Sequence, residues 1–368
     1  MRHILLIGGA GYIGAAIIRY LLENNMKVRV LDNFLYKNTN SIQEFLNNDN
    51  FSFIKGDLCK ETDVKNSLGN ITDAIILGGL VGDPITKKYP DLNEKINVRG
   101  VKNCIDTLNN NGLKKVIFIS TCSNYGLIKD DQIADENFEL KPLSLYAKAK
   151  VEIEKFILGK AKESIDYEPV ILRFATAFGE SARMRFDLTI NEFIYELLNK
   201  KELMVYDPDT WRPYCHVLDF ARLISKIIEI NDKDLSFEIF NAGSDKNNFT
   251  KRGIVNLIAS KIDGSKINFK EGGVDPRNYK VNFKKLETKL NFKTKYNVED
   301  VIDSLIEFIK KRKDIPFAVF KPTCLGKIEL FKKVSKGESL KSEELKKWKR
   351  VVERFEGVCQ KAFDCDVK

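Results

Sequence analysis

Short apolar runs rich in β-branched residues alternate with stretches of helical apolar spacing through the first two thirds of the chain. This alternation is typical of βαβ units, which form a parallel sheet with helices on both faces. Right-handed crossovers bring the carboxyl ends of such strands to one edge, where we expect the site. The expected strands are His3–Ile7, Val28–Leu31, Phe51–Ile54, Ala74–Leu77, Val116–Ser120, Val170–Phe174 and Phe237–Asn241, with helices such as Ile13–Asn24 and Val98–Asn110 between them.

The pattern divides the chain into three parts. Residues 1–175 are expected to form one domain, whose sheet also takes the later strand near 237–241. Residues 176–315 have looser patterning and longer loops, as expected of a smaller α/β substrate-binding lobe. Composition shifts again at residues 316–368, where apolar residues at helical spacing predict a C-terminal helical extension: Leu345, Trp348, Val351, Val352 and Phe355.

Composition excludes several classes of function. No apolar run approaches the roughly 18 residues that cross a bilayer, and the N-terminus lacks a secretory cleavage site, so we expect a cytoplasmic protein without membrane contact. Seven Cys occur with no CxxC pair, which argues against disulfides and against a structural metal site. The net charge is +9, but residues 316–368 hold 13 Lys and Arg against 8 Asp and Glu. Such a mixed-sign surface does not indicate nucleic-acid binding.

The glycines of "LLIGGAGYIG" indicate a dinucleotide site. Gly8, Gly11 and Gly14 have the spacing GxxGxxG between a strand and a helix, which allows a tight turn, backbone contact with a pyrophosphate and close helix packing. Asp32 ends the next strand, where a carboxylate accepts hydrogen bonds from a ribose diol and repels a 2′-phosphate. This favours NAD over NADP. The third strand is followed by Asp57 and Leu58, which we expect near the adenine.

A second motif indicates proton transfer. Tyr146 and Lys150 in "LYAKAK" have the spacing YxxxK, which places an ammonium and a phenol on one helix face. The pKa of a free Tyr phenol is about 10, so a nearby cation is needed before Tyr146 acts as a base at neutral pH. Thr121, in "ISTCSNYG" at the end of a strand, can be directed at the same substrate oxygen.

Taken in order, these motifs resemble the extended short-chain dehydrogenase/reductase family, in its nucleotide-sugar epimerase/dehydratase branch. The resemblance covers roughly residues 1–313 and rests on GxxGxxG, "LDN", "GDL", "LGG", "STCSNYG", YxxxK, "LRFATAFG" and "RPYCHVLDFA". It implies a Rossmann-like doubly wound α/β fold of about seven parallel strands. It also implies that Tyr146 is the base on a sugar hydroxyl, usually at C4, with Lys150 tuning it and Thr121 bonding the reacting oxygen.

The resemblance implies further contacts. Arg212 and Arg277 would bind the diphosphate of a nucleotide sugar, since guanidinium groups suit bidentate phosphate contacts, with Thr176, Arg183 and Arg185 as additional candidates. Asn97 would steady the strand-end region beside the cofactor. The cofactor contacts expected in all are Gly8, Gly11, Tyr12, Ile13, Gly14, Asp32, Asn33, Asp57, Leu58, Leu77, Gly78, Gly79, Asn97, Tyr146 and Lys150.

The chain departs from the family pattern after the catalytic Thr. Family 4,6-dehydratases have acidic residues there, where this chain has Cys122 and Ser123, which we expect to face the substrate. Without a carboxylate, elimination of the C6 hydroxyl lacks its base and its acid, so a dehydratase of that design is disfavoured. A thiol acting at C3 or C5 stays open, although a small buried Cys is the commoner arrangement.

The sequence therefore predicts an NAD-dependent enzyme that oxidises a nucleotide-sugar hydroxyl at C4, as a 4-epimerase. The alternative is a 4-dehydrogenase that releases a keto sugar, because it requires the same Tyr, Lys and Thr. A C3/C5 epimerase, a 4,6-dehydratase and a non-catalytic NAD-binding scaffold remain as weaker alternatives. Apolar positions on Val98–Asn110 and Ala147–Leu158 predict a homodimer through a four-helix seam.

Overall fold

The computed structural model describes residues 2–311 apart from 37, 130, 201, 231–234, 274 and 276. Met1–Asp314 forms one compact unit. The expected division of this unit near residue 175 stays a prediction, and the helix expected within residues 316–368 lies outside the described residues. No helix in the described ranges has both the length and the hydropathy that a membrane crossing requires.

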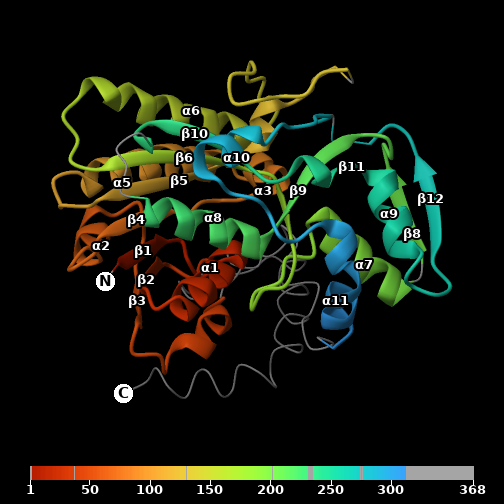
Figure 1. The fold of residues 1–368 in the computed structure, drawn as a ribbon, viewed down its shortest axis with the longest axis horizontal. Coiled ribbons are helices and arrows are strands. Elements are labelled where there is room, and N and C mark those ends of the chain that lie inside the picture. Colours follow the sequence, from red (N-terminus) through yellow and green to blue (C-terminus); the bar gives the residue numbers. More distant parts are fainter. Residues whose placement is uncertain are drawn as a thin grey trace, which may run out of the picture. The chain divides into compact units, whose positions relative to one another are not determined.

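Seven parallel strands form the main sheet, and this confirms the expected fold class (Figure 1). Their order is β10-β6-β5-β4-β1-β2-β3, and it reverses direction between β1 and β4, the place where doubly wound folds bind ligands. Each expected strand occurs within two residues of its expected bounds. The strands are β1 (His3–Ile7), β2 (Lys27–Asp32), β3 (Phe51–Lys55), β4 (Asp73–Ile76), β5 (Lys115–Thr121), β6 (Glu168–Phe174) and β10 (Glu238–Ala242).

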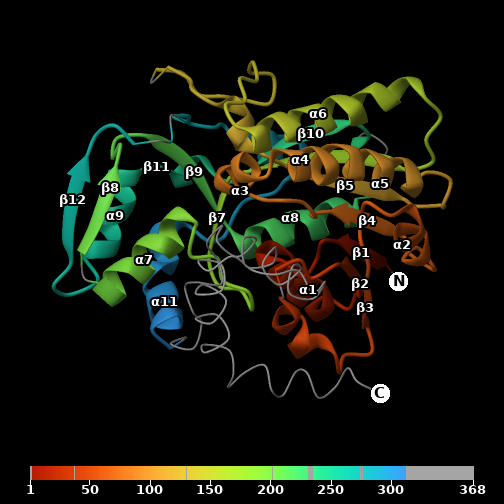
Figure 2. The same cartoon turned by 180° about the vertical axis from the view of Figure 1, so that it is seen from behind.

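Helices cover both faces of this sheet. One face carries α1 (Tyr12–Glu23) and α8 (Val217–Glu229), and the other carries α2 (Glu61–Asn66), α5 (Val101–Leu108) and α6 (Leu145–Gly159) (Figures 1 and 2). The short helices α3 (Asp83–Lys88) and α4 (Pro90–Asn93) precede a π-helical turn at Glu94–Gly100, which runs directly into α5. The helix expected at Val98–Asn110 therefore begins in this turn and ends two residues early.

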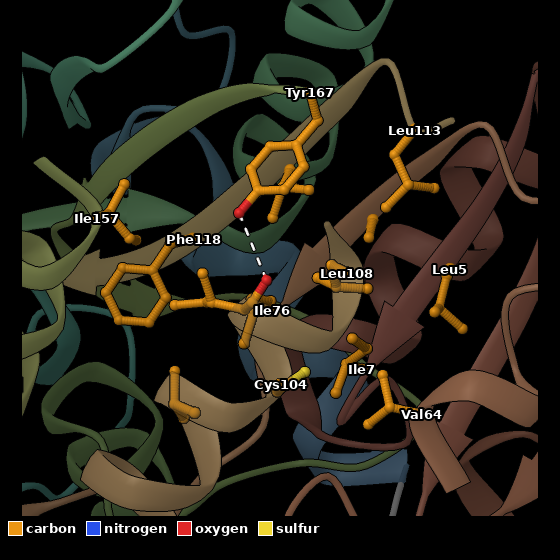
Figure 3. Close-up of a cluster of buried hydrophobic side chains, with 14 of the residues drawn as sticks. Leu5, Ile7, Val64, Ile76, Cys104, Leu108, Leu113, Phe118, Ile157 and Tyr167 are labelled. Carbon is orange, nitrogen blue, oxygen red and sulfur yellow. Dashed lines mark hydrogen bonds between the residues drawn. The ribbon is translucent and has the colours of Figure 1, made fainter. Parts of the chain in front are cut away.

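A hydrophobic core lies between the main sheet and helices α2, α5 and α6. Strand residues such as Leu5, Ile76 and Phe118 pack against Cys104 and the other apolar residues of α5 (Figure 3). All are nearly inaccessible to solvent, and burying an aliphatic or aromatic side chain of this size contributes about 1.5–3 kcal/mol. The same alternate residues that define the strand period therefore fix which face of the sheet meets these helices.

The remaining described strands form two smaller sheets. The first is three-stranded, in the order β11-β9-β7, from β7 (Thr176–Phe178), β9 (Trp211–His216) and β11 (Asn248–Thr250); the second pairs β8 (Glu202–Tyr206) with β12 (Lys266–Lys270) in parallel. The helices of this part are α7 (Thr189–Lys200), α9 (Lys251–Ala259), α10 (Lys284–Leu290) and α11 (Val298–Lys311). These strands agree with the smaller C-terminal α/β lobe expected from the sequence, although the looser pattern after Phe174 did not mark them one by one.

Candidate active site

The glycine-rich turn joins β1 to α1 with very close backbone contacts. Gly8 has a φ of +79°, and a Cβ added there would lie 2.3 Å from the Cα of Gly78. A Cβ on Gly14 would lie 2.1 Å from the carbonyl oxygen of Gly9. Around Gly11 there is space instead, since its nearest such contact is 3.7 Å away. Two glycines thus serve packing, and the third leaves the backbone at the start of α1 open to a ligand.

Asp32 faces this turn from the end of β2. Its carboxylate accepts hydrogen bonds from the backbone N–H groups of Ala10 at 3.0 Å and Phe34 at 2.8 Å. Burial raises the pKa of Asp32, while these two amides and the nearby guanidinium of Arg183 lower it. Asn33 is exposed and accepts a hydrogen bond from the N–H of Leu35, a local turn contact.

The ends of β3 and β4 complete this half of the site. A Cβ on Gly78 would lie 2.7 Å from the Cδ2 of Leu58, so the segment after β3 packs directly on the segment after β4. Asn97 accepts a hydrogen bond from the N–H of Leu80 at 2.8 Å and donates one to its carbonyl at 2.9 Å, and its Oδ1 also lies close to Gly79. Asn97 therefore fixes the chain just after β4. The carboxylate of Asp57 accepts a hydrogen bond from the N–H of Cys59.

Sequence reasoning missed Asn38, which also faces the glycine-rich turn. Its Nδ2 donates to the carbonyl of Ala10, while its Oδ1 is buried without a hydrogen-bond partner. Buried polar atoms are rarely left unpaired, so this oxygen is available to a ligand donor. No periodic or glycine-type signal in the sequence distinguishes this Asn from its neighbours.

Tyr146 and Lys150 lie on one face of α6, as their spacing predicts. The Nζ of Lys150 is 5.8 Å from the centre of the Tyr146 ring and donates to the carbonyl of Ile119 on β5 at 2.7 Å. Burial lowers the pKa of Lys150 to about 8, against an opposing effect of Glu154. At the end of β5, the hydroxyl of Thr121 accepts a hydrogen bond from the N–H of Ser123 at 3.1 Å. All three predicted catalytic residues thus belong to α6 and the adjoining β5.

Charged residues from distant segments surround the Tyr146 phenol. Burial raises the pKa of Tyr146 to about 12; the guanidinium groups of Arg185 and Arg277 lower it, and Asp83 raises it. Arg185 is held by Asp187 through two hydrogen bonds of 3.0 and 2.6 Å. Two of the cations near this phenol are therefore arginines, which the YxxxK motif alone did not indicate.

Arg277 reaches the residue that follows the catalytic strand. Its Nη1 donates to the hydroxyl of Ser123 at 3.2 Å and lies 3.1 Å from Asp83, and its other nitrogens bond Asp275. The Ser123 hydroxyl is also 3.3 Å from the phenol oxygen of Tyr279. Ser123 and Arg277, distant in sequence, are brought together beside Tyr146.

Arg212 lies next to this cluster. Its Nη2 is 3.1 Å from the carboxylate of Asp275, and its guanidinium lies 5.0 Å from the centre of the Tyr279 ring. The Nη2 atom is buried and makes no hydrogen bond of good geometry. Arg212 therefore retains donor capacity for an anionic ligand.

Three candidate substrate residues lie away from the Tyr146 cluster or are turned from it. The thiol of Cys122 donates to the carbonyl of Arg173 at 3.2 Å and is buried in the core, where burial raises its pKa. Its contact with substrate stays a prediction, and this burial argues against it. Arg183 lies beside Gly11 and the Tyr36 ring rather than beside Tyr146. Thr176 is half-buried at the start of β7, opposite Tyr214 of β9.

A buried polar network supports the catalytic face of α6. Glu154, two turns after Tyr146, pairs with Arg173 of β6 at 2.7 Å and accepts hydrogen bonds from Ser120 at 2.5 Å and Asn124 at 2.8 Å. Arg173 also donates to the phenol oxygen of Tyr125 at 3.0 Å. The network links α6 to β5 and β6 directly behind the Tyr146 and Lys150 positions. A sequence signal existed, because residues 146, 150 and 154 share one helical face.

These residues fit a dinucleotide with an anionic centre. The backbone at Gly11 is open, α1 begins there without a side-chain cap or an acidic residue in its first turn, and Asp32 and Asn38 provide acceptors nearby. Helix N-termini attract phosphate groups, and a carboxylate suits a ribose diol. In the described residues, no group of three or more His, Cys, Asp or Glu side chains is arranged to hold a metal ion.

Known proteins resemble this chain in sequence and in fold. A UDP-glucose 4-epimerase of Cyamopsis tetragonoloba is 26% identical over 333 residues, covering 82% of this chain and 93% of that protein. The crystal structure of UDP-glucuronic acid 4-epimerase from Bacillus cereus, in complex with UDP-glucuronic acid and NAD, matches with a TM-score of 0.76 at 25% identity, covering 84% of this chain and 99% of that one.

A dTDP-glucose 4,6-dehydratase from Bacillus anthracis, in complex with NAD, has a TM-score of 0.74 at 20% identity, covering 87% of this chain and 100% of that one. At this level of identity, the match shows only that the two proteins share a fold. The model of the NAD dependent epimerase/dehydratase family matches residues 4–243, which include the glycine-rich turn, Asp32, Thr121, Tyr146 and Lys150. The resemblance expected from the motifs is thereby confirmed, and the chain belongs to the NAD dependent epimerase/dehydratase family.

Proposed function

We propose that this protein is an NAD-dependent nucleotide-sugar 4-epimerase. The observation that carries the proposal is the position of the Tyr146 phenol, which lies above Lys150 on α6 and under the influence of Arg185 and Arg277. A phenol in such surroundings can exchange a proton with a sugar hydroxyl. The relatives named as 4-epimerases, which match nearly the whole length of their own chains, support the choice of C4.

In the proposed reaction, Arg212 binds the diphosphate of the nucleotide sugar, and the sugar extends toward Tyr146. Tyr146 accepts the proton of the C4 hydroxyl, while the hydroxyl of Thr121 donates a hydrogen bond to the reacting oxygen. NAD, held at the open backbone of Gly11 and by Asp32, would supply the hydride acceptor and donor for C4. After the ketone has turned its other face, Tyr146 gives the proton back, and the product is the C4 epimer.

Cations near Tyr146 are essential to this scheme. A free Tyr phenol has a pKa of about 10, and burial raises that of Tyr146 to about 12, which opposes the loss of its proton. The positive charges of Arg185 and Arg277 lower this pKa. The side chain of Lys150 has the same effect when it is protonated. Ser123 bonds Arg277 and Tyr279, so we assign it a supporting role at the sugar rather than a proton transfer.

The side chains at positions 122 and 123, where family 4,6-dehydratases have acidic residues, do not support a dehydratase. Cys122 is turned into the core, and Ser123 is a hydroxyl bonded to Arg277. Neither group can remove a proton at C5 as a carboxylate does. For the cofactor, we propose NAD in preference to NADP, because Asp32 lies at the ribose end of the glycine-rich turn.

The test is a substrate panel with purified full-length protein. UDP-, GDP-, CDP- and dTDP-hexoses are each incubated with the protein, NADH is followed by absorbance, and products are identified by NMR. We expect one C4 epimer to appear without net NADH. A keto sugar with stoichiometric NADH would replace the proposal with a 4-dehydrogenase, and loss of the C6 hydroxyl would replace it with a dehydratase.

Tyr146→Phe is the decisive variant. Removing only the phenol oxygen should lower the turnover rate by about 100-fold or more, because general base catalysis contributes roughly that much. Binding of NAD and of the nucleotide sugar should change little. Tyr20→Phe, on α1 away from the site, is the matched control and should keep wild-type turnover. An active Tyr146→Phe variant would refute the proposed mechanism.

A further inference from the structure

The loop between β7 and α7 is attached to the glycine-rich turn. The hydroxyl of Ser181 donates to the carbonyl of Tyr12 at 2.7 Å, and the phenol of Tyr12 donates to the carbonyl of Gly179 at 2.7 Å. Asn191 at the start of α7 donates to the Tyr12 phenol at 3.1 Å and to the carbonyl of Arg185 at 3.0 Å. All of these contacts involve buried side chains, so they hold the loop against the first turn of α1.

Two arginines of this loop extend toward different halves of the site. Arg185 contributes to the surroundings of Tyr146 and is close to Gly82. Arg183 extends the other way: its Nη1 lies 3.9 Å from the position of a Cβ on Gly11, and its Cζ lies 4.9 Å from the centre of the Tyr36 ring. The loop thus contacts both the proposed sugar end and the proposed cofactor end.

We propose that Arg183 binds the pyrophosphate of the dinucleotide cofactor, so that a loop outside the main sheet closes over the cofactor. This inference rests on the proposed function only for the identity of the cofactor. Three features support it: the guanidinium lies at the open backbone of Gly11, α1 begins there uncapped, and Tyr36 limits the directions in which Arg183 can turn. A guanidinium and a helix N-terminus facing the same space favour a group with two negative charges.

The charges around Arg183 agree with this assignment. Burial and the neighbouring cation Arg185 both lower the pKa of Arg183, while Tyr36, Asp32 and Asp187 raise it. An anion bound at Gly11 would offset the two unfavourable effects. For an epimerase the consequence is retention of the reduced cofactor, which has to stay bound until the hydride returns to the sugar.

Binding measurements on the full-length protein, freed of bound nucleotide, test the assignment. Adenosine, ADP, ADP-ribose and NAD are titrated by calorimetry into wild type, Arg183→Gln and Arg19→Gln. Arg19 is the matched control because it lies on α1 but pairs with Glu44 at the surface. Arg183→Gln should weaken ADP-ribose and NAD by about 10- to 100-fold, as expected for a charged hydrogen bond, and adenosine by less than about twofold.

Two results would overturn the assignment. Unchanged ADP-ribose affinity in Arg183→Gln would show that the guanidinium does not contact the pyrophosphate. An equal loss for adenosine and ADP-ribose would place Arg183 at the adenosine instead. Arg183→Lys should recover part of the affinity if a positive charge is what matters. None of these titrations requires turnover, so a protein that binds in the expected way but does not epimerise sugars would refute only the proposed function.

Discussion

At the scale of single residues, the role of a side chain in the site depends on where it points as much as on its residue type. Cys122 and Ser123 are neighbours, yet one side chain enters the core and the other joins Arg277 and Tyr279. Arg183 and Arg185 likewise diverge toward the glycine-rich turn and toward Tyr146. Because loop residues lack a fixed periodicity, the sequence identified these residues as candidates without separating their roles.

The cofactor preference is a prediction at this scale. Asp32→Ala should reduce the preference for NAD over NADP by about 10-fold or more, because the carboxylate's hydrogen bonds to a ribose and its repulsion of a 2′-phosphate are lost together. Titration of the nucleotide-free protein with both cofactors measures the ratio. Asn47→Ala, at an exposed position outside the predicted cofactor contacts, should leave the ratio unchanged. Equal affinities in wild type would contradict the prediction.

At the scale of elements, helix α6 combines a reactive face with a buried ion pair. Tyr146, Lys150 and Glu154 follow one another at intervals of four residues, and Glu154 ties the helix to Arg173 of β6. A buried charge pair contributes little net stability compared with apolar residues, but the loss of one partner leaves a costly unpaired charge. The pair thus fixes where α6 lies on the sheet, and with it the position of the Tyr146 phenol.

Glu154→Gln tests this arrangement. We expect a loss of about 3–5 kcal/mol in the free energy of unfolding, because the Arg173 guanidinium remains buried without its counter-ion. Urea denaturation gives the measurement. Glu152→Gln on the same helix, where the exposed Glu152 pairs with Lys102, should cost less than about 1 kcal/mol. Similar losses in both variants would show that burial of the pair does not matter.

At the scale of the whole molecule, the proposed dimer through α5 and α6 depends on the outer faces of these helices. The apolar residues of α5 are buried against the molecule's own sheet, as are Ile153 and Ile157 of α6. The outer faces retain Leu158, which is exposed, and the ion pair of Lys102 with Glu152. The homodimer stays a prediction, with a smaller apolar seam than the helical pattern suggested.

Light scattering at micromolar concentration measures the assembly directly. We expect a mass of twice the 42.2 kDa of the chain. Leu158→Lys, which places a charge on the exposed part of α6, should shift the mass toward that of the single chain, because two like charges would meet at the seam. Leu46→Lys, at an exposed position on another part of the molecule, is the control. A wild-type mass equal to that of one chain would contradict the dimer.

The sequence by itself determined the seven strands, the glycine-rich turn and the pairing of Tyr146 with Lys150. Each of these depends on a local pattern: short apolar runs rich in β-branched residues, glycines at fixed spacing, or an interval of four residues. Only the tertiary structure decided that Asp83, Arg185 and Arg277 lie near enough to shift the pKa of the Tyr146 phenol, that Cys122 faces the core and that Arg183 lies at Gly11. These arrangements join segments far apart in the chain, and no local pattern encodes which loop residues meet once the sheet and its helices have packed.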